Sequence, residues 1–403
     1  MSEWRTYRLG DIIQLKSGGT PDKSNPDYWG GSIPWISAKS MYDDFISTSD
    51  LFITEEGLQA GSKIAKKDSI LLLTRGSGLF NRIPVCYVVS DVAYNQDVKN
   101  IVLKQEDVTS IKFLYYWLYG NKELLSSMLE TTGIGAGKID TKRFLNLSIS
   151  LPSQKEQARY IHLMDLLFDK IELNRRINAN LEAQAQALFR SWFVDFEPFR
   201  DGPFVDSELG KIPQGWKVIS LSELMNYSGG SQPPASEFIN SYKDGYVRFI
   251  QIRDYASESH ITYIPISSKN KTCDIRDIMI ARYGASLGRI CYGLKGAYNV
   301  ALAKVLPVKP YYREFLRSYL SSDYFYQSIN MKGNRAVQAG FNQSDINSFR
   351  LSFPKNESVI QTYDKVCSQF LNKRLQVLDE IKTLSALRDT LLPKLMAGEI
   401  NVK

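Results

Sequence analysis

The sequence contains few of the residues that bind metals or carry redox chemistry. It has four cysteines and two histidines in 403 residues. The cysteines stand far apart, at Cys86, Cys273, Cys291 and Cys367, and form no C-x-x-C pair. A zinc site or a redox dithiol normally shows close spacing of such residues. The sequence therefore predicts isolated cysteines, no metal and no cofactor.

Long apolar runs are also missing. The most apolar stretch, Phe113–Tyr119, is far shorter than the roughly 20 residues that cross a bilayer. The N-terminus, Met1–Asp11, has charged residues but no apolar signal core. With 43% hydrophobic and 23% charged residues, the composition is that of a globular protein. We therefore expect a cytoplasmic protein that does not bind membranes.

Complete catalytic motifs are absent as well. The segment Thr131–Lys138 approaches a phosphate-binding loop, but Thr132 stands where the first glycine belongs and Ile139 replaces the hydroxyl residue. We expect a turn there, with Lys138 available to a phosphate. The segment Asn25–Tyr28 resembles the N-P-P-[FY] loop of adenine methyltransferases, yet no glycine-rich cofactor loop accompanies it, so a turn is favoured again. A carboxylate–lysine nuclease site built from distant residues stays open at this stage.

The positive charge is unevenly distributed. The whole chain carries a net charge of +7. Residues 1–150 hold 17 basic and 17 acidic side chains, whereas residues 206–353 hold 18 and 12. Neutralisation of phosphates by lysine and arginine contributes much of the affinity for DNA, so the second half is the stronger candidate for binding DNA. A solvated basic surface gives the same pattern, so charge alone does not establish this function.

The chain does contain an internal repeat, whose two copies lie about 200 residues apart. Trp4 and Leu9 precede Ser17-Gly18-Gly19 in the first copy, and Trp216 and Leu221 precede Ser228-Gly229-Gly230 in the second. The remaining landmarks follow in the same order: Ile33–Ser37 with Val247–Gln251, Asp68–Gly76 with Asp277–Gly284, Ala93–Asn95 with Ala297–Asn299, and Leu151-Pro152 with Phe353-Pro354. In this alignment Arg75 and Arg282 take the same place.

Each copy is predicted to be a globular part followed by a long helix. Apolar runs predict core strands at Ile70–Leu73 and Val85–Val89, and apolar spacing predicts helices at Ile111–Leu118 and Tyr311–Leu320. The long helix after Pro152 begins with Ser153 and Glu156, the residues of a capping box.

The predicted parts are residues 1–152, a helix over 153–199, a linker rich in proline and glycine over 200–215, residues 216–354, and a second helix with a tail over 355–403. A helix of 40 residues is on the order of 60 Å long and needs a partner along its length. The other long helix is the economical partner, which gives a coiled coil. Packing of each helix on its own domain is the alternative.

Several segments together resemble the DNA-specificity subunits of type I restriction-modification enzymes. The resemblance spans nearly the whole chain, at Leu9–Ile12, Ser17–Pro21, Tyr28–Trp35, Leu151-Pro152 with Glu156-Gln157, Leu188–Phe196, Ile212–Trp216, Leu387–Leu395 and Gly398–Ile400. One departure is Lys355–Ser358, which replaces the Pro-x-x-Glu-Gln pattern at the start of the second helix.

The resemblance implies an α+β fold in which two similar target recognition domains are joined by two long helices that form an antiparallel coiled coil, with a pseudo-two-fold internal repeat. It implies a non-catalytic subunit that binds double-stranded DNA, two methyltransferase subunits and two restriction subunits. Each domain would read one half of an asymmetric split target, and the helices would set the gap. The alternatives are a two-headed scaffold that binds only protein and an enzyme fragment with its own catalytic site.

Candidate base-reading residues are polar side chains in or beside glycine-rich loops, since arginine or lysine reads guanine and asparagine or glutamine reads adenine. In the first domain they are Lys39, Arg75, Ser77, Asn81, Gln96 and Lys138, and in the second Arg253, Arg282, Tyr283, Ser286, Arg335, Gln338, Asn342 and Gln343. The shared place of Arg75 and Arg282 favours phosphate anchoring or a structural role. Trp192, Phe193 and Phe196 are either core residues, which is favoured, or a docking patch for a methyltransferase subunit.

Overall fold

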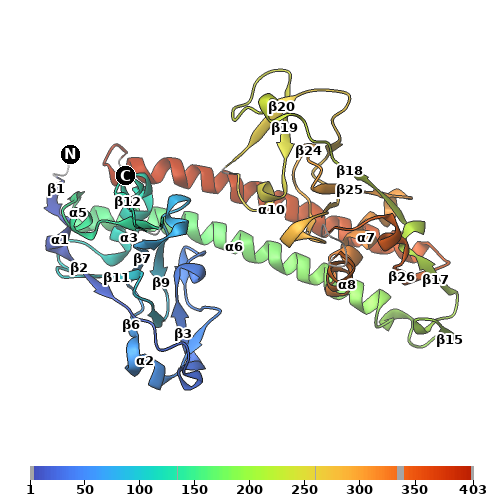
Figure 1. The fold of residues 1–403 in the computed structure, drawn as a ribbon, viewed down its shortest axis with the longest axis horizontal. Coiled ribbons are helices and arrows are strands. Elements are labelled where there is room, and N and C mark those ends of the chain that lie inside the picture. The colour runs from blue at the N-terminus through green and yellow to red at the C-terminus, as the bar shows by residue number, and fades with distance from the viewer. Residues whose placement is uncertain (1–3, 134, 259, 334–339, 401–403) are drawn as a thin grey trace. The chain divides into compact units, whose positions relative to one another are not determined.

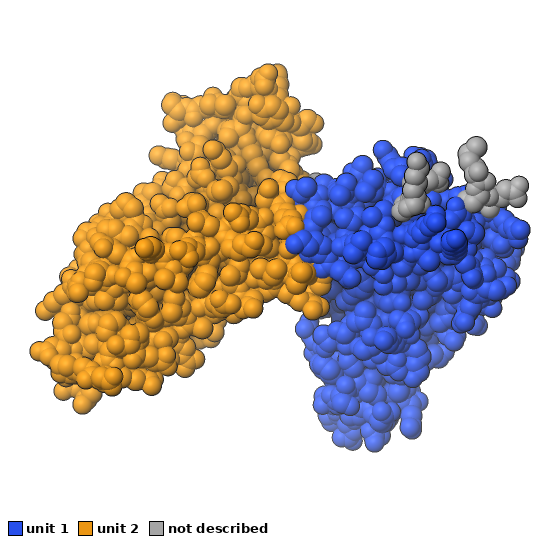
Figure 2. Space-filling view, turned by 180° about the vertical axis from the view of Figure 1, so that it is seen from behind, with its two compact units in different colours: residues 1–171, 383–403 blue, residues 172–382 orange. Residues whose placement is uncertain are grey.

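The computed structural model describes residues 4–133, 135–258, 260–333 and 340–400. The chain forms two compact units, unit 1 with residues 1–171 and 383–403, and unit 2 with residues 172–382 (Figure 2). The division falls inside the two long helices, α6 (Gln154–Phe193) and α10 (Ser358–Met396) (Figure 1). Each unit therefore contains one globular head and a part of both helices.

In unit 1 a five-stranded sheet has the order β2-β11-β7-β9-β4 and a four-stranded sheet the order β5-β3-β10-β6. Smaller sheets are β1-β14 and β12-β13-β8. The strands are β1 (Arg5–Arg8), β2 (Ile13–Ser17), β3 (Trp29–Ile36), β4 (Phe45–Ile46), β5 (Phe52–Ile53), β6 (Lys63–Ala65), β7 (Ile70–Leu73), β8 (Arg75–Gly76), β9 (Val85–Val88), β10 (Val92–Tyr94), β11 (Val98–Leu103), β12 (Leu129–Thr131), β13 (Gly137–Ile139) and β14 (Ser148–Leu151). The helices of this head are α1 (Leu9–Ile12), α2 (Glu55–Gly61), α3 (Ile111–Gly120), α4 (Lys122–Ser126) and α5 (Thr141–Leu145), with 3-10 turns η1 (Pro26–Tyr28), η2 (Ala38–Ser40) and η3 (Ser77–Phe80).

Unit 2 has sheets of order β18-β25-β22-β23 and β20-β19-β24-β21, and the pairs β17-β26 and β15-β16. The strands are β15 (Phe204–Ser207), β16 (Gly210–Pro213), β17 (Trp216–Ser220), β18 (Met225–Gly229), β19 (Tyr246–Ile250), β20 (Thr262–Pro265), β21 (Thr272–Cys273), β22 (Met279–Ala281), β23 (Ile290–Cys291), β24 (Gly296–Tyr298), β25 (Leu302–Pro307) and β26 (Arg350–Pro354). The helices are α7 (Arg313–Leu320), α8 (Asp323–Gly333) and α9 (Gln343–Asn347), with 3-10 turns η4 (Glu197–Phe199), η5 (Leu221–Glu223), η6 (Ala235–Glu237), η7 (Ile252–Tyr255), η8 (Gly284–Ser286) and η9 (Pro310–Tyr312).

The two heads repeat one sheet plan, which confirms the duplication predicted from the sequence. β3 runs parallel to β10 with Trp35 opposite Ala93, and β19 runs parallel to β24 with Phe249 opposite Ala297. In each head a strand from the start of the copy pairs antiparallel with a strand from its end, β1 with β14 and β17 with β26. The predicted core strands and helices are present as β7, β9, α3 and α7.

Strand pairing corrects the glycine match by one residue. A Cβ on Gly18 would stand 2.1 Å from the Tyr94 carbonyl oxygen, and a Cβ on Gly230 would stand 2.1 Å from the Asn299 carbonyl oxygen. Both glycines therefore allow the same close approach of two backbones at the end of a parallel strand pair. Gly18 corresponds to Gly230, and Ser17 corresponds to Gly229.

The match of Arg75 with Arg282 is also wrong by one residue. Because Asn95 corresponds to Asn299, Val98 of unit 1 corresponds to Leu302 of unit 2. Leu73 lies opposite Val98, and Ala281 lies opposite Leu302, so Leu73 corresponds to Ala281. The next residue in each strand donates its backbone N–H to the turn that follows the parallel strand, from Thr74 to Asp97 at 2.9 Å and from Arg282 to Ala301 at 2.8 Å. Arg282 thus takes the place of Thr74, and Tyr283 takes the place of Arg75. Because side chains alternate along a strand, this slip changes which residue faces outward.

The long helices contribute to the core of each head. In unit 1 the hydrophobic core includes Met164 and Phe168 of α6 and Leu392 of α10. In unit 2 it includes Phe189 and Phe193 of α6 and residues from the start of α10. Packing on the heads, which was the alternative for these helices, therefore accompanies packing of the helices on each other.

The two long helices run antiparallel. In unit 1 the Arg388 guanidinium of α10 lies 5.0 Å from the centroid of the Phe168 ring of α6. In unit 2 Arg374 Nε donates to Asn178 Oδ1 at 2.9 Å, and Arg374 also bonds Glu182. Early residues of α6 thus meet late residues of α10.

The ends of the first long helix differ from the expected range of 153–199. At its start the Glu156 carboxylate accepts from the backbone N–H of Ser153 at 3.2 Å and from its hydroxyl at 2.8 Å. The helix ends at Phe193, and Phe196 adopts a left-handed backbone conformation with φ of 53°. The segment expected as a linker, 200–215, contains the hairpin of β15 and β16.

Candidate functional site

In the first head, Lys39 and Gln96 follow two parallel strands that end together. Asn95 donates its N–H to the Ile36 carbonyl at 3.0 Å, where β10 and β3 end. Lys39 lies in η2, just beyond β3, and is exposed. Gln96 is exposed and its Oε1 accepts from the Thr20 hydroxyl at 2.7 Å. The fold therefore brings both predicted residues to one edge of the sheet.

Arg75 and Lys138 lie beside this edge. They are opposite each other in the antiparallel pair β8-β13, and both are exposed. The backbone of Thr74 connects them to the Gln96 turn, because its N–H bonds the Asp97 carbonyl and its carbonyl accepts from Ile139 N–H at 2.9 Å. Within the described part of the chain, no side chain forms a hydrogen bond or ion pair with Arg75 or Lys138. Two cations are thus presented to solvent side by side.

The remaining residues predicted in the first head lie on the next turn. Ser77 is in η3 and Asn81 follows it, and both are exposed. Lys99 was missed by the sequence analysis, although a lysine in an otherwise apolar strand was a usable signal. Partial burial lowers the pKa of the Lys99 ammonium, and the nearby Arg75 guanidinium acts in the same direction, against Asp97.

In the second head Arg253 occupies the place of Lys39. Asn299 donates its N–H to the Ile250 carbonyl at 3.1 Å, as Asn95 does to Ile36 in the first head. Arg253 lies in η7, just beyond β19, and is exposed. Its Nε is 3.9 Å from a carboxylate oxygen of the buried Asp254. Burial raises the pKa of Asp254, and its backbone and arginine neighbours oppose that shift.

Arg282 is enclosed by aromatic rings. Its guanidinium carbon lies 5.0 Å from the ring centroid of Tyr283, 5.9 Å from that of Tyr227 and 6.0 Å from that of Phe341. Its Nε is buried without a hydrogen-bond partner among the described residues. Such contacts hold the guanidinium in one plane. Tyr227 and Phe341 were not singled out from the sequence, because no local pattern relates them to Arg282.

Tyr283 is the outward residue of this site. It is 42% exposed and pairs with Gly340 in an isolated antiparallel bridge. The first head carries Arg75 opposite Lys138 at the same place. A phenol and a glycine thus replace two cations, so the heads present different chemistry on a common scaffold.

The other predicted residues of the second head are less concentrated. Ser286 is half-buried in η8. Asn342 caps α9, and its Oδ1 accepts from the backbone N–H groups of Ser344 and Asp345, so that oxygen has a structural role. Gln343 is exposed and donates to Asn347 at 3.0 Å. Arg335 and Gln338 lie outside the described residues.

The aromatic residues proposed for partner docking belong largely to the core of unit 2. Phe193 is 5% exposed and its ring centroid lies 4.9 Å from that of Phe315, so it offers almost no surface to a partner. Trp192 packs against Tyr363 with ring centroids 6.0 Å apart. Phe196 packs against Trp216 at 5.2 Å.

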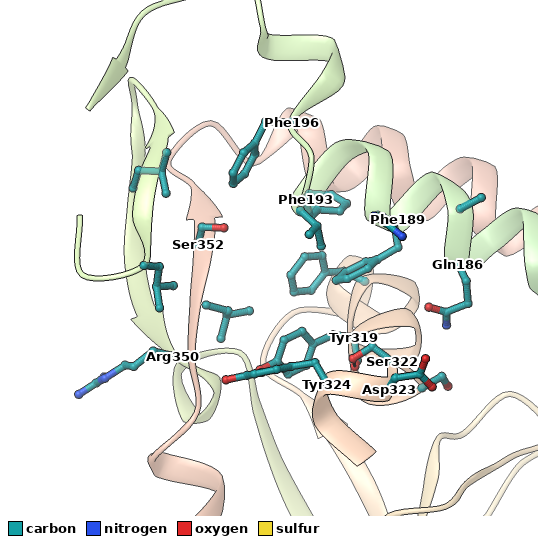
Figure 3. Close-up of a pocket in the computed structure, with 18 residues that line it drawn as sticks. Gln186, Phe189, Phe193, Phe196, Tyr319, Ser322, Asp323, Tyr324, Arg350 and Ser352 are labelled. Carbon is teal, nitrogen blue, oxygen red and sulfur yellow. Dashed lines mark hydrogen bonds between the residues drawn. The ribbon is translucent and has the colours of Figure 1, made fainter. Parts of the chain in front are cut away.

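An open groove of about 890 Å³ borders these aromatic residues. It lies between the end of α6, the start of α8 and β26, and Figure 3 shows Phe189, Phe193 and Tyr319 along its wall. Arg350 and Asp323 stand at its polar rim (Figure 3). This groove, more than Phe193 itself, gives unit 2 an accessible apolar surface.

The two near-motifs are turns, as predicted. The segment Thr131–Lys138 spans the hairpin of β12 and β13, in which Gly135 N–H bonds the Thr132 carbonyl at 2.8 Å. Lys138 therefore lies in a strand and not at the helix N-terminus that a phosphate-binding loop requires. Asn25 caps the short turn η1. Over the residues that the structure describes, no helix is long and apolar enough to span a membrane and no group of potential metal ligands is found.

Comparisons with known proteins agree on one family. A family model described as the type I restriction modification DNA specificity domain matches residues 1–183 and 213–382. The chain is 27% identical over 425 residues to the type I restriction enzyme MjaIX specificity subunit of Methanocaldococcus jannaschii, covering 100% of this chain and 94% of that protein. It is 24% identical to the HindI specificity subunit of Haemophilus influenzae, covering 99% and 100%.

A solved structure shows the same fold. The crystal structure of the type-I restriction-modification system S subunit from M. genitalium matches with a TM-score of 0.59 at 17% identity, covering 98% of this chain and 96% of that one. The fold of two similar α/β heads with long connecting helices therefore agrees with the fold that the sequence predicted.

Proposed function

This chain belongs to the type I restriction modification DNA specificity family, and we propose from that premise that it is the non-catalytic subunit that selects the DNA target of a type I complex. Each head reads one half of an asymmetric, split sequence in double-stranded DNA. A subunit with this role works on cellular and incoming DNA, which places its activity in the cytoplasm.

The observation that carries the proposal is the different chemistry at one shared place in the two heads. Arg75 stands opposite Lys138 in the first head, and Tyr283 stands opposite Gly340 in the second. Arginine and lysine are the usual partners of guanine, whereas a tyrosine offers one hydroxyl and an apolar ring. Two heads with one scaffold and different outward side chains suit a target with two unlike halves.

The long helices suit the role of a spacer. α6 has 40 residues and α10 has 39. We propose that they set the gap between the two half-sites. Deleting seven residues from both helices removes two turns, about 10.5 Å, and is expected to shorten the gap by about three base pairs. A gap that stays unchanged in the shortened variant would contradict the spacer role.

The same helices are the proposed docking sites for two methyltransferase subunits, and two restriction subunits complete the complex. The apolar groove at the end of α6 supports docking there. Phe196 and Tyr324 border it, and its volume of about 890 Å³ can hold a cluster of side chains from a methyltransferase subunit. Phe193 lines this groove, and Trp192 packs against Phe193 with ring centroids 6.3 Å apart.

Mapping of DNA methylation tests the proposed function. The chain is co-expressed with its methyltransferase subunit in a host free of DNA methylation, and the methylated adenines are sequenced. An asymmetric split motif that depends on this chain is the expected result. Methylation without a motif, or an identical motif in its absence, would instead favour the protein-only scaffold.

A further inference from the structure

Lys99 of the first head is a half-buried cation without a carboxylate partner. It lies opposite Ser17 in the pair β11-β2, and its Nζ donates to Ser17 Oγ at 2.6 Å and to the Gln96 carbonyl at 3.2 Å. Within the described residues no ion pair is formed by Lys99. Asp97 opposes the lowering of the Lys99 pKa from beyond ion-pair distance, so no direct counter-ion offsets the desolvation of this ammonium.

The second head has no cation at the corresponding position of β25, and the neighbouring Lys304 is already paired with Asp277 at 2.7 Å. Because Asn95 corresponds to Asn299, Lys99 corresponds to Ala303, which lies opposite Gly229. The places of Lys99 and Ser17 are therefore taken by an alanine and a glycine. The two smaller residues leave space on this face of the sheet.

Arg282 fills that space from the neighbouring strand. Ile280 lies opposite Ala303, so their side chains point to the same face of the sheet. Arg282 follows Ile280 by two residues, so its side chain points to that face as well. Its Nη1 stands 2.8 Å from the position that a Cβ on Gly229 would take. The first head has Thr74 at this place, buried and bonded to the Asp97 carbonyl at 2.9 Å.

Three differences between the heads thus act together. Where the first head has Ser17, Lys99 and Thr74, the second has Gly229, Ala303 and Arg282. On this face of the sheet each head places a half-buried cation for which no ion pair is found among the described residues, and the two cations come from different positions in the sequence. The outward residues Arg75 and Tyr283, in contrast, share a position and differ in chemistry.

We infer that Lys99 and Arg282 are equivalent anion-binding residues, one in each head, and that each contacts a DNA phosphate beside its half-site. The inference rests on the proposed function. Phosphate is the group that two unlike half-sites have in common, so a cation present at the same location in both heads matches it. The unlike residues Arg75 and Tyr283 are left to distinguish bases.

The test measures how DNA binding by the complex with its methyltransferase subunit depends on salt. Lys99→Gln and Arg282→Gln remove the charge but keep a hydrogen-bond donor. Each is expected to lower the magnitude of the slope of log affinity against log salt by about 0.9, and the double variant by about 1.8. The methylated motif is expected to stay unchanged, because a phosphate contact affects all sequences alike.

The matched controls are one exposed lysine in each head that already has a carboxylate partner. Lys66 follows β6 and pairs with Asp91 at 2.7 Å, and Lys295 precedes β24 and pairs with Asp274 at 3.6 Å. Lys66→Gln and Lys295→Gln are expected to leave the slope unchanged. A loss of slope in these controls equal to that in Lys99→Gln would overturn the assignment.

A second variant tests the same role of Lys99 independently, in case Lys99→Gln fails to fold. Ser17→Asp leaves Lys99 in place and neutralises it with an adjacent carboxylate, so it is expected to lower the slope as Lys99→Gln does. An unchanged slope in Ser17→Asp, or a motif relaxed at one base position in Lys99→Gln, overturns the phosphate role. If the unaltered complex gives no split motif at all, the proposed function fails and not this inference alone.

Discussion

The two heads attach their long helices by different chemistry. At the start of α6 the side chain of Gln157, 2% exposed, accepts from the Thr109 hydroxyl at 2.8 Å and donates to the Val108 and Pro152 carbonyls at 3.0 Å. At the start of α10 the Glu357 carboxylate gathers the ammonium of Lys309 and two tyrosine hydroxyls. A neutral buried amide thus serves in one head, and an ionic cluster at the surface serves in the other.

This difference explains the departure of Lys355–Ser358 from the pattern of the first helix. α10 begins at Ser358, whose N–H bonds the Asn356 side chain at 3.1 Å. Glu357 then holds the helix to the Lys309–Tyr312 turn. The duplicated scaffold thus keeps its backbone geometry while individual contacts change their chemistry, as the outward residues Arg75 and Tyr283 also do.

The largest effect is expected where the heads share a backbone contact. Gly18→Ala and Gly230→Ala each place a methyl group 2.1 Å from a carbonyl oxygen, so each is expected to destabilise its own head by about 3 kcal/mol or more. Hydrogen exchange resolved by segment measures the two heads separately. Gly78→Ala, with nothing within 4 Å, is the control. Loss of protection in only one of the two glycine variants would break the proposed equivalence.

Substitution of the outward residues sharpens the comparison. If Arg75 reads a base, Arg75→Ala is expected to cost about 1–3 kcal/mol at one position and relax one half-site only. Tyr283→Ala is expected to relax the other half-site. Methylation mapping shows both changes. Gln154→Ala, an exposed substitution at the start of α6, serves as a control that should leave both half-sites intact. Relaxation of the same half-site by both variants would refute the assignment of one half to each head.

The two helix attachments should respond differently to pH. Hydrogen bonds from Lys309, Tyr311 and Tyr312 lower the pKa of Glu357 to about 2, from an unfolded value of 4.5. The stabilisation is therefore fully present above about pH 4.5 and is lost as the pH falls toward 2. Glu357→Gln should lower the melting temperature at pH 7 and have little effect near pH 2.

Gln157→Leu is the matched variant in unit 1. It leaves two carbonyls and a hydroxyl without their partner, and is expected to cost about 2 kcal/mol at any pH. Thermal unfolding across the pH range compares the two variants. A pH-dependent loss in Gln157→Leu, or a constant one in Glu357→Gln, would contradict the distinction between neutral and ionic attachment.

The smallest effect concerns the helix that follows α3 or α7 in each head. α4 begins with Lys122, whose Nζ lies 3.2 Å from the Tyr119 ring centroid, whereas α8 begins with the exposed Asp323. Burial lowers the pKa of Lys122 to about 8, and Arg388 adds to this shift against Asp44. Protonation of Lys122 is thus disfavoured in the folded state, so the protonated side chain destabilises the fold. This destabilisation is fully present below about pH 8 and disappears above pH 10.5, the pKa of lysine in the unfolded chain. Lys122→Met also removes the contact of the ammonium with the Tyr119 ring, which offsets the relief of desolvation. The melting temperature of unit 1 should therefore rise only slightly at pH 7 and less at pH 10, and a uniform gain would exclude this cause.

The sequence by itself determined the elements and their order. Apolar spacing located the core strands β7 and β9, the helices α3 and α7, and the two long helices, because these patterns depend on residues close together in the chain. The repeated landmarks established the duplication, and the ordered family segments pointed to DNA specificity. Five of the candidates, Lys39, Gln96, Arg75, Lys138 and Arg253, lie at the same edge of their respective heads.

Only the tertiary structure decided how the copies align residue by residue. Matching of letters paired Arg75 with Arg282 and Gly18 with Gly229, whereas the strand pairing shifts both by one. A shift of one residue reverses the face that a side chain occupies, and it is fixed by hydrogen bonds between segments far apart in the chain. For the same reason the sequence could not show that Tyr227 and Phe341 enclose Arg282, nor that Lys99 and Arg282 reach one place from different strands.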